Sequence, residues 1–180
     1  SSSIKFRNLT INNTAGVTLQ KNITTSNLAG NLLVQSGTLY NGGFTITGNG
    51  SRTITIRNNA GIDVSGNTTA FSGFGTKVIE TNSTVNYSGD NQNIAANNYG
   101  NLTISGSGIK TLQGNTSANE LILIESGYLD LNANTLTINS SSPSAISRSS
   151  GGIISENTSV TSKIQWNVGT AVGSYLFPFV

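Results

Sequence analysis

The sequence of 180 residues predicts an all-β protein, a parallel β-helix (solenoid) with coils of about 22 residues. Three observations predict this fold. Asn, Ser, Thr and Gly make up just over half of the chain, and no segment shows the apolar period of a helix. Short apolar–polar–apolar triplets recur along the chain instead. These triplets return at a nearly constant spacing, which is typical of a repeat architecture.

Each triplet is expected to form one short strand. Two apolar residues flank a polar one, which is often Thr, and Gly, Asn or Ser usually ends the run. This alternation is typical of a strand with one buried face, and the β-branched Thr suits the outward position. The clearest examples, in chain order, are residues 9–11, 17–19, 44–46, 54–56, 62–64, 85–87 and 136–138.

The triplets fall into rows that advance by about 22 residues per step. Three strands per repeat are what a three-sided parallel β-helix needs, with coils stacked about 4.8 Å apart. The two clearer rows are centred on Thr18, Leu39, Asp63, Asn86, Thr111, Asp130 and Ile153, and on Thr10, Leu33, Thr55, Val78, Thr103 and Leu123. One buried ladder is expected to contain Leu9, Leu32 or Val34, Ile54 or Ile56, Val78 and Leu102.

The alternative fold is a series of antiparallel β-sandwich repeats, because closely spaced short strands are also typical of that architecture. The constant spacing and the scarcity of Asn-Gly hairpin signals favour the solenoid. The Ser-rich segment 139–150 could be a linker between domains. We favour an enlarged corner loop, since the repeat continues on both sides of it.

A longer repeat divides the chain into two tandem copies, about 1–98 and 99–180. FRNLTI at residue 6 matches YGNLTI at residue 99, and SGTL at residue 36 matches SGYL at residue 126. We therefore expect residues 1–180 to form one continuous solenoid. The chain starts with Ser1 and contains no Met, so we also expect it to be a fragment of a longer polypeptide.

The composition argues against several classes of function. The chain has no His and no Cys, so the usual transition-metal ligand sets and the Ser-His and Cys-His nucleophile pairs cannot be built. Its nine Lys and Arg residues are spread singly, which argues against a nucleic-acid partner although the net charge is +2. No apolar run is long enough for membrane insertion. We expect a protein that is not an enzyme and carries no cofactor or metal.

The carboxylates are expected to be solvated. Asp63 and Asp130 fall on one predicted row but three coils apart, roughly 14 Å, which is too far for the carboxyl pair of a glycosidase. Three Asp in the whole chain are too few for a calcium-binding repeat. The full set of carboxylates is Asp63, Asp90, Asp130, Glu80, Glu120, Glu125 and Glu156.

Aromatic and Thr side chains are the remaining candidates for ligand binding. Exposed aromatic rings could stack on sugars, although we favour packing at corners or under loops. Thr pairs on a flat face could bind ice, but these pairs fall in different rows or distant coils. The ligand-binding residues therefore stay unknown. The aromatic candidates are Tyr40, Tyr87, Tyr99, Tyr128, Trp166 and Tyr175, and the Thr pairs are Thr45/Thr47, Thr53/Thr55 and Thr135/Thr137.

Several segments resemble the Asn/Thr/Gly-rich tandem-repeat regions of large exported cell-surface proteins of the Bacteroidetes. They are NYGNLTISGSGIKTL, ESGYLDLNANTLTI and SKIQWNVGTAVGSYLFPF. Those adhesin-like proteins often carry the repeats ahead of a sorting domain of the type IX secretion system. The resemblance covers residues 99–168 well and 6–68 more loosely. It implies an extracellular or cell-surface location, and it transfers no functional residue to this chain.

The leading functional hypothesis is a non-catalytic extracellular stalk, adhesin or fibre-forming segment of a bacterial surface protein. The alternative is a polysaccharide- or ice-binding solenoid module, and a polysaccharide-degrading β-helix enzyme comes third. The apolar run 175–180 offers no polar cap for a terminal coil. The expected partners are therefore further repeats of the same polypeptide or neighbouring copies end to end, with surface glycans as a second class.

Overall fold

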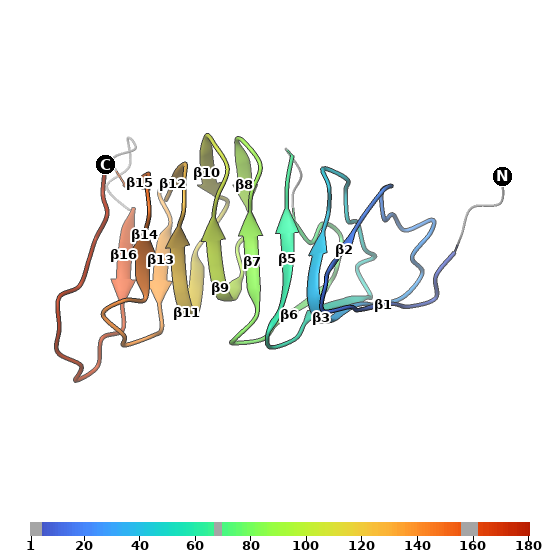
Figure 1. Cartoon of the computed structure of the whole chain (residues 1–180), viewed down its shortest axis with the longest axis horizontal. Helices are drawn as coiled ribbons and strands as arrows, with labels where there is room; N and C mark the ends of the chain where they lie inside the picture. The colour runs from blue at the N-terminus through green and yellow to red at the C-terminus, as the bar shows by residue number, and fades with distance from the viewer. Residues whose placement is uncertain (1–4, 67–69, 156–161) are drawn as a thin grey trace.

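The computed structural model describes residues 5–66, 70–155 and 162–180. These residues form β-strands, turns and loops but no helix, and the strands pair in parallel throughout. They wind into a solenoid of about six turns with a spacing of about 23 residues (Figure 1). The predicted parallel β-helix is confirmed, and the antiparallel sandwich is excluded.

The solenoid has three faces, and the first two belong to one sheet that contains 12 of the described strands. Strands β3 (Leu32–Tyr40), β9 (Asn98–Ile104) and β11 (Thr116–Ile124) cross the corner between these two faces, so each contributes its first half to the first face. The first face consists of β1 (Leu9–Asn12), the start of β3 (Leu32–Tyr40), β4 (Thr53–Ile56), β6 (Thr76–Ile79), the start of β9 (Asn98–Ile104), the start of β11 (Thr116–Ile124), β13 (Thr135–Ile138) and β16 (Lys163–Trp166).

The second face completes this large sheet, and the third face is a separate sheet. The second face consists of β2 (Val17–Thr18), the end of β3, β5 (Ala60–Val64), β7 (Thr84–Tyr87), the ends of β9 and β11, and β14 (Ile146–Arg148). The third face consists of β8 (Gln92–Ile94), β10 (Ile109–Leu112), β12 (Tyr128–Asp130) and β15 (Gly152–Ile154). Single bridges, such as Ile23 to Ile46, extend it towards the N-terminus.

The core contains a ladder of apolar side chains that follows the solenoid axis. On the second face, each inward residue pairs directly with the inward residue of the next turn, and none of them is more than 2% exposed. Complete burial of such a side chain contributes about 1.5–3 kcal/mol, so the ladder is a principal source of stability. Its members are Leu39, Ile62, Val85, Leu102, Ile122 and Ile146.

One turn of the solenoid is shorter than those before it. Leu39, Ile62 and Val85 follow one another at intervals of 23 residues, but Val85 pairs with Leu102, which is only 17 residues later. Because this turn is short, none of its strands pairs with the outer edge of β6. Strand β6 is therefore the last strand of one branch of the large sheet. The first face is therefore interrupted after β6.

Two members of the predicted ladder are placed differently in the structure, and the short turn accounts only for Leu102. Leu9, Leu32 and Ile54 pair as expected on the first face. Val78, however, points outward and is 40% exposed, because the residue that pairs with Ile54 is its neighbour Lys77. Leu102 is fully buried, but on the second face.

The same short turn breaks both predicted rows. The row through Val78 was expected to continue at Thr103 and Leu123, but these two pair with each other on the second face. The row through Asn86 was expected to continue at Thr111 and Asp130, at a nearly constant spacing. In the structure Asn86 pairs with Thr103 on the second face, whereas Thr111 and Asp130 pair with each other on the third face. A constant period therefore fails where the turn length changes.

The Ser-rich segment 139–150 is not a linker between domains. β13 ends at Ile138 and β14 starts at Ile146, and both strands pair with β11. The residues between them form an enlarged corner loop, as favoured from the sequence. The strand at Ile146–Arg148 lies inside the predicted segment, so the loop proper is shorter than expected.

Asn side chains at the corners connect one turn to the next. Asn8 Oδ1 accepts a hydrogen bond of 2.9 Å from the Asn31 amide, 23 residues later. Asn31 Oδ1 accepts one of 3.0 Å from the Thr53 amide, after a further 22 residues. Such bonds occupy backbone donors that the turns would otherwise leave unpaired. Equivalent bonds run from the amides of Thr45, Asn82, Ile109 and Thr135 to Asn22, Asn58, Asn91 and Asn115.

Candidate functional site

The carboxylates of the described residues do not converge on one site. Asp63 lies on the second face and Asp130 on the third, so the prediction that they share a row is wrong. The short turn after Val85 moves the later residues onto another face. No group of three or more acidic residues that could hold a metal ion occurs in the described ranges, and Glu156 lies outside them.

Asp63 belongs to a hydrogen-bonded row on the outside of the second face. Its Oδ2 accepts a bond of 2.7 Å from Asn86 Nδ2, and its Oδ1 accepts one of 2.5 Å from Ser88 Oγ. Ser105 Oγ then donates to Asn86 Oδ1 at 2.8 Å. Asp63 therefore connects adjacent turns, which is a structural role.

Glu80 also connects two turns. Its Oε1 lies 2.5 Å from Arg57 Nη1, and its Oε2 accepts a hydrogen bond of 2.8 Å from the Asn58 amide. The bond from Asn58 and then the Arg57 guanidinium lower the pKa of the Glu80 carboxyl. Because the pair is exposed, we assign it a local role at the corner before β5.

Tyr87 and Tyr99 are both completely buried, which confirms the packing interpretation for these two rings. Their hydroxyl oxygens lie 3.0 Å apart. Tyr99 donates to the Ala95 carbonyl at 2.7 Å, and the Ala95 amide donates to the Tyr87 hydroxyl at 3.3 Å. Burial raises the pKa of Tyr87 to about 12 and the pKa of Tyr99 well above its usual value.

Trp166 and Tyr175 pack together near the C-terminus, again as favoured from the sequence. Their ring centroids lie 4.8 Å apart, edge to face, and Phe177 adds a third ring 5.4 Å from Trp166.

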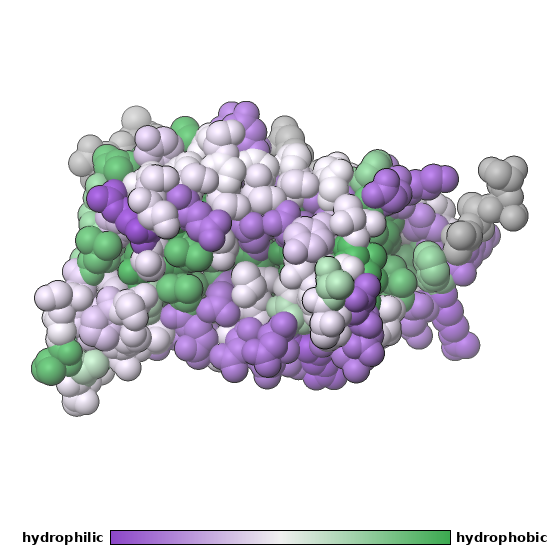
Figure 2. Space-filling view, in the orientation of Figure 1, coloured by the Kyte–Doolittle hydropathy of each residue, from purple (hydrophilic) through white to green (hydrophobic). Residues whose placement is uncertain are grey.

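Figure 2 shows hydrophobic residues along the middle of the visible face, between hydrophilic ones, and also at the end of the rod near the C-terminus.

Tyr40 and Tyr128 are different, because they are 41% and 42% exposed. Tyr40 ends β3 on the second face, whereas Tyr128 starts β12 on the third face. Packing at a corner does not describe these two rings. They are the exposed tyrosines among the aromatic candidates.

Two of the predicted Thr pairs lie on the same face. Thr53/Thr55 in β4 and Thr135/Thr137 in β13 alternate with buried residues on the first face. The interrupted region after β6 lies between them, so they do not form one continuous lattice. Thr45/Thr47 flank the bridge residue Ile46 and belong to the third face.

Lys110 is a buried cation that the sequence analysis did not single out. Its side chain is 0% exposed, and Nζ donates to the Gly89 carbonyl at 2.8 Å and to the Ser107 carbonyl. Burial lowers the pKa of Lys110, although Asp90 opposes this effect. In the structure Lys110 and Leu112 point inward, but the residues Ile109–Leu112 do not alternate in hydropathy, so the sequence carried no clear signal for a buried Lys110.

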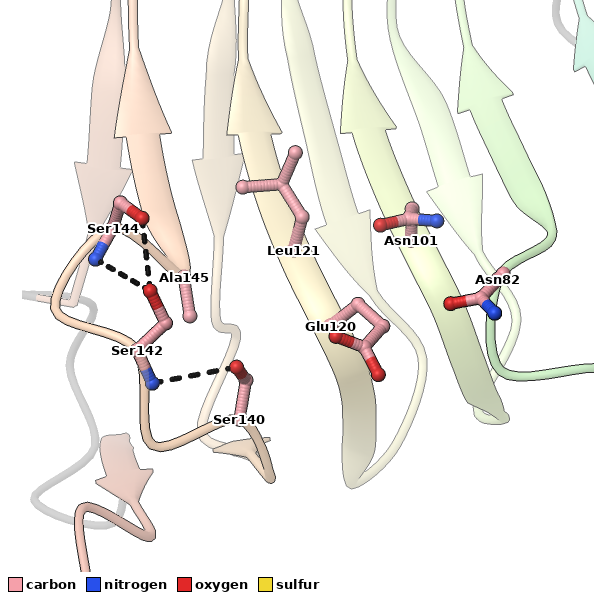
Figure 3. Close-up of a pocket in the computed structure, with 8 residues that line it drawn as sticks. All are labelled: Asn82, Asn101, Glu120, Leu121, Ser140, Ser142, Ser144 and Ala145. Carbon is pink, nitrogen blue, oxygen red and sulfur yellow. Dashed lines mark hydrogen bonds between the residues drawn. The ribbon is translucent and has the colours of Figure 1, made fainter. Parts of the chain in front are cut away.

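A shallow groove of about 330 Å³ follows the corner between the first and second faces, beside the loop after β13 (Figure 3). A second groove, of about 430 Å³, continues towards the N-terminus and shares Asn82 with the first. Glu120 is the ionisable side chain among the residues that line them. The first groove can therefore offer hydrogen bonds, mainly from Asn82, Asn101, Glu120, Ser140, Ser142 and Ser144.

Comparisons with known proteins give no family assignment. No protein-family model, no curated protein and no solved structure matches the chain. None of the described residues belongs to a helix with the length and hydropathy of a membrane span.

Proposed function

We propose that this chain is a non-catalytic, rod-like spacer segment of an extracellular bacterial surface protein. The observation that carries the proposal is that three kinds of contact connect each turn of the solenoid to the next. Strand pairs, the apolar ladder through Leu102, and corner Asn side chains such as Asn31 all join successive turns. A solenoid built in this way holds its two ends apart with little internal freedom.

The surface chemistry supports an exposed location. Charged residues are 9% of the chain, and outward strand positions often hold Thr or Asn, as in β4, β7 and β13. Several such side chains are already bonded between turns, as Asn86 is to Asp63. The similarity of residues 99–168 to exported surface repeats supports the same location.

The last turn provides a surface for a further repeat or a neighbouring copy. The Ile153 amide donates to the Pro178 carbonyl at 2.8 Å, and the Val180 amide donates to the Ile153 carbonyl at 3.1 Å, so the final segment extends the third face. Its apolar side chains remain between 44% and 55% exposed: Leu176, Phe177, Phe179 and Val180. Stacking of another coil on this end would bury them.

Small-angle scattering and limited proteolysis of residues 1–180 test the spacer role. We expect an elongated particle and a core that trypsin leaves intact when native but digests after heating. A compact spherical envelope, or rapid digestion of the native chain, would contradict the proposal.

Light scattering over a range of concentrations tests the stacking surface separately. End-to-end association would raise the mass in steps of one chain, and replacement of Leu176 and Phe177 by Ser would remove these steps. If the chain remains a monomer at every concentration, neighbouring copies are excluded as partners.

A further inference from the structure

The outer side of the third face carries a polar row next to an apolar row. Asn93, Thr111 and Asp130 pair across β8, β10 and β12, so they form one polar row over three successive turns. Ile109 and Tyr128 pair in the next row, and they are 39% and 42% exposed. We call these five residues the third-face strip.

The register fixes the dimensions of the third-face strip. Neighbours within a row come from adjacent strands and lie about 4.8 Å apart, whereas the two rows are separated by two residues, or roughly 6.6 Å. A groove of about 470 Å³ lies here and is lined by Asn91, Gln92, Asn93, Ile109, Thr111 and Asp130. A groove of this size suits one sugar-sized ring or a short chain of such rings.

The polar row is held in place and yet keeps groups for a ligand. Gln113 Nε2 donates to Asn93 Oδ1 at 3.0 Å, and the Asn132 amide donates to Asp130 Oδ1 at 2.8 Å. Within the described residues, Asn93 Nδ2, Asp130 Oδ2 and the Thr111 hydroxyl have no protein partner. A pre-positioned donor, an acceptor and a hydroxyl thus point outward in one line.

The second face provides an internal comparison. There Asn86 pairs with Asp63 and bonds to it at 2.7 Å, and Ser105 of the next turn bonds to Asn86 at 2.8 Å. These side chains therefore join turns by bonding to one another. In the third-face strip Asn93 Oδ1 also accepts a bond from Gln113 of the next turn, but among the described residues Asn93, Thr111 and Asp130 do not bond to one another.

The apolar row adds a surface for stacking. A half-exposed Tyr ring next to an Ile offers an apolar platform of the kind that packs against the flat side of a sugar ring. The C-terminal segment bounds this platform, because a Cβ on Gly152, the residue paired with Tyr128, would lie 2.4 Å from Val180 Cγ1. The C-terminal segment thus limits the third-face strip on the side of β15.

We propose that the third-face strip binds a neutral pyranose oligosaccharide. A sugar ring stacks on Tyr128 and Ile109, and its hydroxyls bond to Asn93, Thr111 and Asp130. The exposed charge of the strip is the Asp130 carboxylate, since Lys110 is buried beneath and bonded to carbonyls, so acidic sugars are disfavoured. Ice is disfavoured by the protruding Tyr128. The site does not depend on the spacer role, because a rod can carry it or lack it.

Calorimetric titration of residues 1–180 with cellohexaose, laminarihexaose, mannohexaose and hexagalacturonate tests the site. We expect at least one neutral probe to bind with Kd of about 1 mM or tighter, and the acidic probe to bind more weakly. Tyr128→Ala should weaken binding about tenfold, and Thr111→Val, which keeps the strand-forming shape, should also weaken it. Tyr40→Ala is the matched control, because Tyr40 is equally exposed on another face.

Thermal unfolding of each variant establishes that the fold is retained, and amide chemical shifts locate the ligand independently. Shifts confined to β8, β10 and β12 support the site. Three results would each overturn the site. The first is that no neutral probe binds at a concentration 10-fold above the expected Kd. The others are equal weakening of binding by Tyr40→Ala and Tyr128→Ala, and tighter binding of hexagalacturonate than of the neutral probes. None of these results alters the scattering and proteolysis that test the spacer role.

Discussion

The hydroxyl oxygens of Tyr87 and Tyr99 lie 3.0 Å apart inside the solenoid, and both connect to Ala95. Because the Ala95 amide donates to Tyr87 and Tyr99 donates to the Ala95 carbonyl, Tyr87 must donate to Tyr99. The three bonds form a closed ring. It satisfies both hydroxyls and both backbone groups of Ala95 without water, at the connection between β8 and β9.

Tyr99→Phe should destabilise the chain by about 1–3 kcal/mol, because it leaves the buried Tyr87 hydroxyl and the Ala95 carbonyl without a partner. Chemical denaturation of the variant and the wild type measures this difference. Tyr40→Phe is the control, since the Tyr40 ring is exposed and has no such network. Equal stability of the two variants would show that the ring of hydrogen bonds contributes nothing.

The buried tyrosines should also make the fold sensitive to alkali. The pKa of Tyr87 is raised by burial to about 12, above the value near 10 in the unfolded chain. Below about pH 10 both states hold the proton, so stability is complete; above it the unfolded state loses the proton first, and stability falls. The loss from Tyr87 alone reaches about 2 kcal/mol near pH 12.

Denaturation curves at pH 9, 10, 11 and 12 measure this effect. Tyr99 acts in the same direction, because its pKa is also raised. The Tyr87→Phe variant should show a shallower decline, since it removes one of the two groups. A flat profile of the wild type from pH 9 to 12 would contradict the burial of these hydroxyls.

The register of the core can be tested with two single substitutions. Leu102→Ala should cost about 2–5 kcal/mol, because Leu102 is fully buried and the cavity cannot fill. Val78→Ala should cost less than about 0.5 kcal/mol, because Val78 is 40% exposed on an edge strand. A constant 22-residue spacing predicts that both are costly, so a large loss for Val78→Ala would favour that register.

The fold class was predictable from the sequence because each strand carries its own alternation of apolar and Thr residues, as Thr53–Ile56 does. The alignment of strands was predictable only where turns have equal length. After Val85 the turn takes 17 residues, and no local pattern announces this change. Thr111 and Asp130 were therefore placed on the wrong face.

The third-face strip could not be predicted for the same reason. Tyr128 and Asp130 were both candidates from the sequence, but their common face with Ile109 depends on the pairing of β10 with β12. Lys110 was not identifiable from the sequence of β10, and of its two carbonyl partners Gly89 belongs to the preceding turn, whereas Ser107 lies just before β10. Contacts between turns require the register, and the register requires the turn lengths.

Packing between turns is very tight at Gly37, where β3 bends from the first face to the second. Its φ is +68°, and a Cβ there would lie 1.8 Å from the Asn13 carbonyl oxygen of the preceding turn. Two other glycines allow the effect of the positive φ to be measured separately from the effect of the close contact. Gly43 has a φ of +82° with nothing within 4 Å of the added atom, and Gly50 has open space and no positive φ.

Gly37→Ala should therefore destabilise the chain by more than about 2 kcal/mol, because the backbone of one turn must move away from the other. Gly43→Ala should cost about 1–2 kcal/mol for the left-handed conformation alone. Gly50→Ala should lie within about 0.5 kcal/mol of the wild type. Thermal denaturation of the three variants checks this order, and a Gly37→Ala variant no less stable than Gly43→Ala would mean that the turns are not in contact at this corner.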